Sequence, residues 1–248
     1  MPGLLTSVQG IFRQKVTQPQ TPGTPMDLRT SAYGDLSSLS VFNGLQAAAV
    51  ERSYYTGVNE GTRGTGVNLT NGTGTTYAAV QALCIVTNNN PPGGPDVILD
   101  YLAIRVDTVI TAGTFWHLYH ALDQGNRYAS GGQLMTMQNA DGSSPPGVLA
   151  YTGVVVAGAA NANQVHDVGY NLIANGVLVA NAFVVIKFGR LENPVSGTFT
   201  TPTTAVAQST FDAPPITIAP GWSYVCNEFQ AARTATGVGE FFLGFIVR

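Results

Sequence analysis

The sequence has few charged residues and no long apolar run, and these absences limit what the protein can be. Only 10% of its 248 residues are charged, against 44% that are hydrophobic, whereas a typical soluble chain has roughly 25% charged residues. A free monomer relies on surface charge for its solubility. The scarcity of charge therefore predicts a homo-oligomeric subunit, packed against copies of itself.

Basic residues are scarce and scattered, and the formal net charge at pH 7 is −3. Because no basic arm or patch is present to neutralise phosphates, we expect no direct contact with nucleic acid. No stretch reaches the roughly 18 unbroken apolar residues of a membrane helix, and the N-terminus lacks a signal-peptide pattern. We therefore expect no membrane partner.

The sequence contains two cysteines, Cys84 and Cys226, and both lie within apolar strand patterns. A disulfide between them is one possibility. Buried free thiols are the favoured interpretation, since buried cysteine behaves as a small apolar residue. Free thiols also fit a reducing cytoplasm.

Motifs for nucleophilic and metal-assisted catalysis are absent. The sequence has no Gly-x-Ser-x-Gly elbow, and neither cysteine has a histidine near it in sequence. His117 and His120 are three apart in a predicted strand, so their side chains should leave on opposite faces and cannot share a metal ion. We interpret both as partly buried hydrogen-bonding residues and predict no metal site.

Four aspartates, Asp96, Asp100, Asp107 and Asp123, lie on or near predicted strand ends. Paired carboxylates perform acid–base chemistry when their pKa values are driven apart. In a β protein, such residues more often cap turns or pair with arginine. The sequence therefore predicts no enzyme and no cofactor, and a carbohydrate-active enzyme is the most distant of the alternatives.

Strand and turn patterns fill most of the chain after residue 77. Pro220–Gly221 predicts a type II turn, because glycine accepts the positive φ at the third position. Residues 222–229 and 240–248 follow as strands. In the last of these, Phe242 and Ile246 should face opposite to a second apolar set, so that both faces are covered and the chain ends in a central strand of the sandwich. That second set is Phe241, Leu243, Phe245 and Val247.

Further strands are expected at residues 77–86, 96–109, 115–122, 148–156, 167–173 and 177–188, with a strand or long loop at 198–209. In residues 96–109, alternation places Ile98 with Leu102, Ile104 and Val106 on one face. Strands separated by frequent turns predict an all-β fold, an antiparallel β-sandwich. A jelly roll is the first choice among such sandwiches, as one domain over residues 31–248.

Residues 1–30 are predicted to form an N-terminal arm. Pro19, Pro22 and Pro25 hold its second half extended, as in a polyproline linker. Its first half carries four apolar residues that would otherwise lie in water. Two interpretations stay open, a disordered tail and an arm that contacts a neighbouring subunit. The apolar residues are Leu4, Leu5, Ile11 and Phe12.

Three segments together resemble virion structural proteins of bacterial viruses. They are residues 99–105 (LDYLAIR) with 125–132 (GNRYASGG), the Pro220–Gly221 turn, and the closing strand that begins at Gly239-Glu240-Phe241. The likeness spans roughly residues 31–248. It implies a β-sandwich of the jelly-roll type that decorates or cements a capsid shell, often as a trimer, and it implies no catalytic residues.

We therefore predict a homotrimeric capsid decoration protein that binds the major capsid protein and bridges coat subunits. The predicted subunit contacts are Leu4, Leu5, Ile11, Phe12, Phe241 and Phe245. One alternative is a tail-fibre or receptor-binding head that recognises a host glycan through Tyr54, Tyr55, Trp116 and Trp222. Another is a jelly-roll coat protein that forms the shell itself.

Overall fold

A computed structural model describes the backbone of eight segments of the chain. The N-terminal arm and its boundary at residue 31 lie outside them, so both remain predictions. Among the described residues there is no helix, and hence no helix that could span a membrane. The described segments are residues 51–59, 67–69, 81–108, 116–159, 165–174, 180–189, 208–230 and 237–248.

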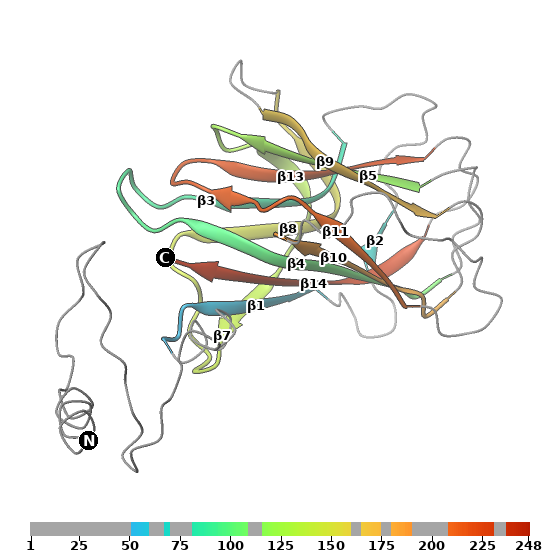
Figure 1. The fold of residues 1–248 in the computed structure, drawn as a ribbon, viewed down its shortest axis with the longest axis horizontal. Coiled ribbons are helices and arrows are strands. Elements are labelled where there is room, and N and C mark those ends of the chain that lie inside the picture. Colours follow the sequence, from blue (N-terminus) through green and yellow to red (C-terminus); the bar gives the residue numbers. More distant parts are fainter. Residues whose placement is uncertain are drawn as a thin grey trace, which may run out of the picture. The chain divides into compact units, whose positions relative to one another are not determined.

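The described strands form two sheets that face each other (Figure 1). All pairings are antiparallel except that of β10 with β11. In spatial order, the first sheet is β11 (Gln208–Ala213), β10 (Phe183–Phe188), β4 (Val97–Val106), β14 (Val238–Val247), β1 (Tyr54–Asn59) and β7 (Thr136–Asn139), with β12 (Thr217–Ile218) beside β4 and β2 (Val67–Asn68) beside β14. The second is β6 (Tyr128–Leu134), β8 (Val148–Ala157), β3 (Gln81–Asn88), β13 (Ser223–Gln230), β5 (Trp116–Asp123) and β9 (Val165–Ala174). The predicted β-sandwich is confirmed.

Eight of the described strands pair in a nested order. β1 pairs with β14, β3 with β13, β4 with β10, and β5 with β9. Successive pairs alternate between the first and second sheets. The first of these strands thus pairs with the last, and each later pair lies inside the previous one in sequence. The C-terminal strand β14 is consequently central, between β4 and β1, as predicted.

The main core lies between the sheets and is centred on β14. Phe241, Leu243 and Phe245 are fully buried there, and the Phe245 ring stacks on Tyr55 with centroids 5.6 Å apart. Phe242 points outward and is half-buried, which confirms the predicted alternation. Phe241 and Phe245 were also predicted as subunit contacts. That prediction is corrected, because both rings are enclosed within their own chain and offer no surface to another.

A β-bulge in the β4–β14 pairing changes the predicted orientation of one residue. The register shifts between Gly244 and Phe245, so that Gly244 lies opposite Tyr101 and Phe245 lies opposite Leu99. An extra residue in a strand reverses the alternation beyond it. Leu99 is therefore in the core, and Ile98, predicted to point inward, is half-buried on the outer face beside Ile246.

The chain passes directly from one sheet to the other at Met135, between β6 and β7. Met135 is buried, and its backbone N–H donates to the Ala150 carbonyl at 2.9 Å. This corner joins the edge strands on one side of the sandwich, and β9 approaches β11 on the other side. Sequence analysis assigned no strand to β1, β6 or β7, which are short or rich in glycine and polar residues.

The predicted turn at Pro220–Gly221 is confirmed. Gly221 has a φ of 83°, and the Trp222 N–H donates to the Ala219 carbonyl at 3.0 Å. The turn leads into β13, which places Cys226 opposite Cys84 on β3. Both cysteines are free and fully buried, as favoured from the sequence.

We expect both native thiols to be inert in the folded protein. Burial raises the pKa of Cys226 to about 12 and raises that of Cys84 well above its ordinary value, and the thiolate is the reactive form. A maleimide at pH 8 should therefore label neither thiol until the protein is unfolded. Thr210→Cys, at an exposed position on β11, provides a positive control. Rapid labelling of the native wild-type chain would contradict this burial.

Candidate functional site

The two histidines of β5 lie on opposite faces, as predicted. His120 is fully buried in the core, where its Nδ1 is 2.7 Å from the Tyr224 hydroxyl and its ring contacts Phe188 edge-on. His117 is half-buried on the outer face and stacks near Tyr119. His120 is thus a hydrogen-bonding core residue. Among the described residues, no three His, Cys, Asp or Glu side chains are grouped as metal ligands would be.

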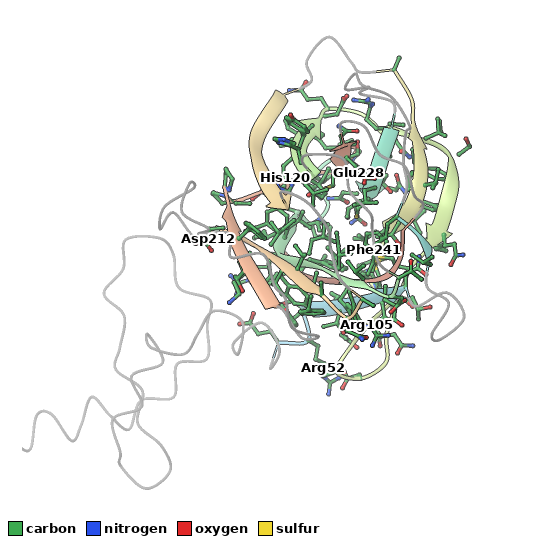
Figure 2. The ribbon with its side chains drawn as sticks, turned by 90° about the vertical axis from the view of Figure 1, so that its right-hand side faces the viewer. Arg52, Arg105, His120, Asp212, Glu228 and Phe241 are labelled. Carbon is green, nitrogen blue, oxygen red and sulfur yellow. The ribbon has the colours of Figure 1, made fainter. Side chains whose placement is uncertain are left out.

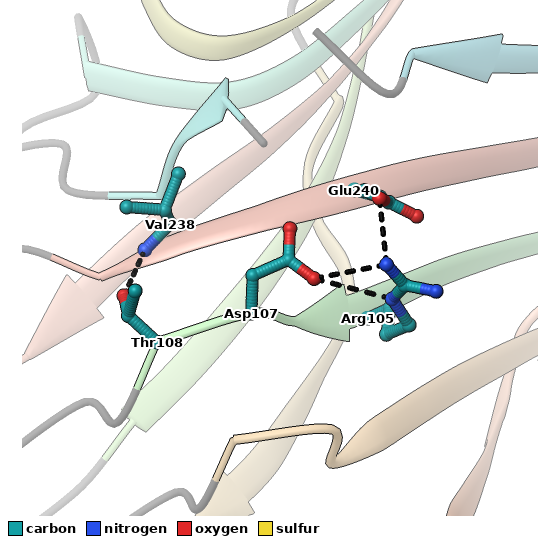
Figure 3. Close-up of polar contacts among 5 residues, drawn as sticks. All are labelled: Arg105, Asp107, Thr108, Val238 and Glu240. Atoms are coloured by element: carbon teal, nitrogen blue, oxygen red, sulfur yellow. Dashed lines mark hydrogen bonds and ion pairs between the residues drawn. The ribbon is translucent and has the colours of Figure 1, made fainter. Parts of the chain in front are cut away.

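Arg105 joins two carboxylates on the outer face of the first sheet (Figure 3). Its Nη2 atom lies 3.1 Å from Asp107 Oδ1 and 2.7 Å from Glu240 Oε1. Asp107 follows β4, and Glu240 is buried on β14 beside it. The predicted pairing of an aspartate with Arg105 is confirmed. Because the guanidinium holds both carboxylates, this group is a clamp between neighbouring strands.

Asp100 has a tyrosine partner on the same face. The Tyr54 hydroxyl donates to Asp100 Oδ2 at 2.8 Å. Burial, followed by the hydrogen bond and charge of Asp100, raises the pKa of Tyr54 far above its ordinary range. Burial also raises the pKa of Tyr101. Both phenols therefore stay neutral. The hydrogen bond connects β4 to β1 across β14, and it pairs Asp100 with a phenol and not with a second carboxylate.

Asp123 and Arg127 form a fully buried ion pair on the outer side of the second sheet. Arg127 Nη1 is 3.0 Å from Asp123 Oδ2, and Nε donates to the Gly158 carbonyl at 2.9 Å. The backbone N–H of Arg127 also donates to Ser223 Oγ, and the Ser223 hydroxyl donates to the Gly125 carbonyl. These bonds hold residues 124–127 against β13, where they connect β5 to the distant edge strand β6.

The aromatic platform expected of a glycan-binding head is not assembled from the residues that were predicted. Tyr55 is in the core, Tyr54 is bonded to Asp100, and Trp222 packs against the core. The side chain of Trp116 lies outside the described part. His166 and Asp167 belong to β9, whose side chains are likewise not described.

A different feature is the outer face of the second sheet, whose described side chains combine exposed apolar groups with a lack of exposed charge. β3, β6 and β8 contain no charged residue, and Asp141 is the single one between residues 128 and 157. Among the described side chains of this sheet and its connection at residues 124–127, the charged ones are buried. They are Asp123, Arg127 and Glu228, exposed by 0%, 1% and 2%. Burial also lowers the pKa of His117, which favours its neutral form.

Four side chains form a continuous patch at the β6–β8 edge of this face, which we call the leucine–tyrosine patch. Leu134 on β6 lies directly opposite Tyr151 on β8, and Leu149 precedes Tyr151 by two residues on the same face. Tyr128 stacks on Tyr151 with ring centroids 3.7 Å apart. Leu134 is 55% exposed and Leu149 37%, so the patch offers apolar surface to a partner.

A small second core supports the patch from below. The two tyrosines pack against a cluster of buried apolar residues on the outer face of the second sheet. Small side chains allow the tyrosine rings and the 124–127 connection to lie close to the sheet. The cluster consists of Ala82, Ile85, Ala121, Val155, Ala157 and Val225. The patch therefore lies on a packed, preformed surface.

The first sheet carries the exposed charge. In Figure 2, Arg52, Arg105 and Asp212 lie at the periphery, whereas His120, Glu228 and Phe241 lie inside. Among described side chains, the exposed and half-exposed charges occur on this sheet or on residues that adjoin its strands, with four basic and six acidic groups and a net charge of −2. They are Arg52, Arg105, Lys187 and Arg248, with Glu51, Asp96, Asp100, Asp107, Asp141 and Asp212.

The predicted contacts Leu4, Leu5, Ile11 and Phe12 lie outside the described residues, and the patch residues were missed from the sequence. A usable signal was present, because no charged residue occurs between Arg63 and Asp96 and one occurs in residues 128–157. That β3 from the first stretch and β8 from the second are neighbours in one sheet became apparent from their pairing. No known family, curated protein or solved structure matches the chain.

We expect the buried ion pair of Asp123 and Arg127 to stabilise the folded outer face of the second sheet. Asp123→Asn should lower the free energy of unfolding by about 3–5 kcal/mol, because Arg127 keeps a buried charge without its carboxylate. Replacing both residues, as Asp123→Leu with Arg127→Met, should cost less than that single change. Denaturant unfolding measures both.

The control for this test is Arg52→Met, which breaks the ion pair with Asp141. Those side chains are 70% and 40% exposed, so the loss should be at most about 1 kcal/mol. Equal losses for Asp123→Asn and Arg52→Met would contradict the assigned role of the buried pair.

Proposed function

We propose that this chain is a non-enzymatic, homo-oligomeric virion surface protein that stabilises a bacterial-virus capsid by bridging coat subunits. The observation that carries the proposal is the one-sided surface of the sandwich. Among the described side chains, exposed charge lies on the first sheet or on residues that adjoin it, and the leucine–tyrosine patch lies on the second. Such a subunit has one side suited to water or a charged partner and one side suited to protein contact.

The energetics favour association through the uncharged side. Burying a leucine completely is worth about 1.5–3 kcal/mol, and Leu134 and Leu149 retain part of that free energy while they are exposed. Interfaces are distinguished by depletion of charge at their centre and enrichment in tyrosine. On a shell, many weak contacts of this kind combine into firm attachment, because within one oligomer each bound subunit raises the effective concentration of the others.

The nested strand order supports a jelly roll as the finer description of the sandwich. In a jelly roll, a long antiparallel ribbon folds over so that successive strand pairs alternate between two sheets, as β1–β14, β3–β13, β4–β10 and β5–β9 do. Viral capsid proteins are among the proteins that use this architecture. The proposed partners are further copies of this chain, as a trimer, and the major capsid protein, on virions assembled in the host cytoplasm.

A second candidate is a jelly-roll coat protein that forms the shell itself, and the same strand order favours it. The two candidates differ in what the purified chain does alone. A coat protein assembles into closed particles, whereas a decoration protein stops at a small symmetric oligomer and requires a preformed shell. A glycan-binding head receives less support, since Tyr55 is enclosed in the core.

We predict that the purified full chain forms a small closed oligomer at micromolar concentration and binds capsids that lack it. Binding should saturate and should raise the temperature at which those capsids break, because each bound oligomer bridges coat subunits. Light scattering and a thermal-release assay measure these properties, with fully decorated capsids as the control that binds no more. A monomer that leaves capsids unchanged would refute the proposal, and spontaneous closed shells would favour the coat protein.

A further inference from the structure

We infer that the leucine–tyrosine patch is the contact between two copies of this chain, and that the first sheet faces away from that contact. The inference rests on the proposed homo-oligomer and specifies which surface forms it. Three properties of the described residues support it: the exposure of the patch, the distribution of charge and the geometry of the β6 edge.

The patch is contiguous, which separates it from ordinary scattered surface leucines. Isolated apolar side chains are common on soluble proteins, whereas adjoining ones mark interaction sites. Leu134, Tyr151, Leu149 and Tyr128 touch or adjoin one another on one face. The tyrosine pair is held from below by the second core, so it can bind without first ordering flexible side chains.

Charge selects a second copy as the occupant. Among the described side chains, the exposed and half-exposed charges on or beside the first sheet sum to −2, so pairing two first sheets would bring like net charges together. Two uncharged patches meet without that repulsion. Around a rotation axis, residues at the axis meet their own copies. A neutral patch at the axis therefore suits a trimer as well as a dimer, with the acidic faces outside.

The edge strand β6 favours contact through side chains over contact by continuation of the sheet. Gly131 and Gly132 have φ values of 73° and 65°, and the β6–β8 register shifts twice, on either side of Gly131. Such bulges break the regular row of backbone donors and acceptors that an added strand requires. Copies should therefore meet through the face that carries Leu134 and Leu149.

The first experiment introduces charge into the patch. Leu134→Glu and Leu149→Glu should each weaken association of the full-length chain by about 30-fold or more, as expected for substitutions at the centre of an interface. Thr210→Glu, at an exposed position on β11 of the first sheet, should leave association unchanged. Light scattering over a concentration series measures association, and thermal unfolding shows whether each variant is folded.

The second experiment tests proximity without disrupting the contact. Both native cysteines are buried, so Leu149→Cys provides an exposed thiol at the patch. A short bis-maleimide should convert the assembled Leu149→Cys protein into covalent dimers. Thr210→Cys should give none. Cross-linking through Thr210→Cys together with none through Leu149→Cys would overturn the inference.

Capsid binding, measured in parallel, separates this inference from the proposed function. Loss of the oligomer in Leu134→Glu with residual, weaker capsid binding supports both. An intact oligomer that no longer binds capsids means that the patch faces the coat protein, which overturns the inference and keeps the proposed function. A wild-type monomer that binds capsids likewise overturns the inference and keeps the proposed capsid role. A wild-type monomer that binds none overturns both.

Discussion

The structure depends on the burial of one apolar strand, β14, between its neighbours and the opposing sheet. Phe241, Leu243 and Phe245 fill the space between the sheets, and Tyr55 stacks on Phe245 from the adjoining strand. β14 has a hydrogen-bonded strand on each side, β1 and β4, so its backbone groups are paired while its side chains are packed. With so few charges available, apolar packing of this kind supplies most of the stability of the sandwich.

The two outer faces of the sandwich differ in chemistry. On the first sheet, Arg105, Asp107 and Glu240 form an ionic clamp, and Asp100 accepts a hydrogen bond from Tyr54. On the second sheet, Asp123 and Arg127 are buried, and the exposed residues of β6 and β8 are uncharged, among them Leu134, Leu149 and Val156. Among the described side chains, exposed charge therefore lies on one side of the sandwich, which is what a subunit with a dedicated protein-binding face requires.

Much of the fold was predictable from the sequence, because strand alternation and turn chemistry are local signals. They predicted the sandwich, the central place of β14, the turn at Gly221 and the opposite orientation of the two histidines of β5. Bulges were not predictable, since the shift that turns Ile98 outward depends on pairing with Gly244 and Phe245. The sidedness of charge was missed for a similar reason. β3 and β8, which carry no charge, are separated in sequence, and only strand pairing makes them neighbours in the second sheet.

The central claim is that association covers the leucine–tyrosine patch on the second sheet. Hydroxyl-radical footprinting of the full chain, above and below its association concentration, tests it at the side chains themselves. The account predicts that Leu134, Leu149 and Tyr151 become protected on association while Tyr54 and Tyr101, on the first sheet, are modified as before. Protection of Tyr54 and Tyr101 with unchanged modification of Leu134 and Leu149 would contradict it.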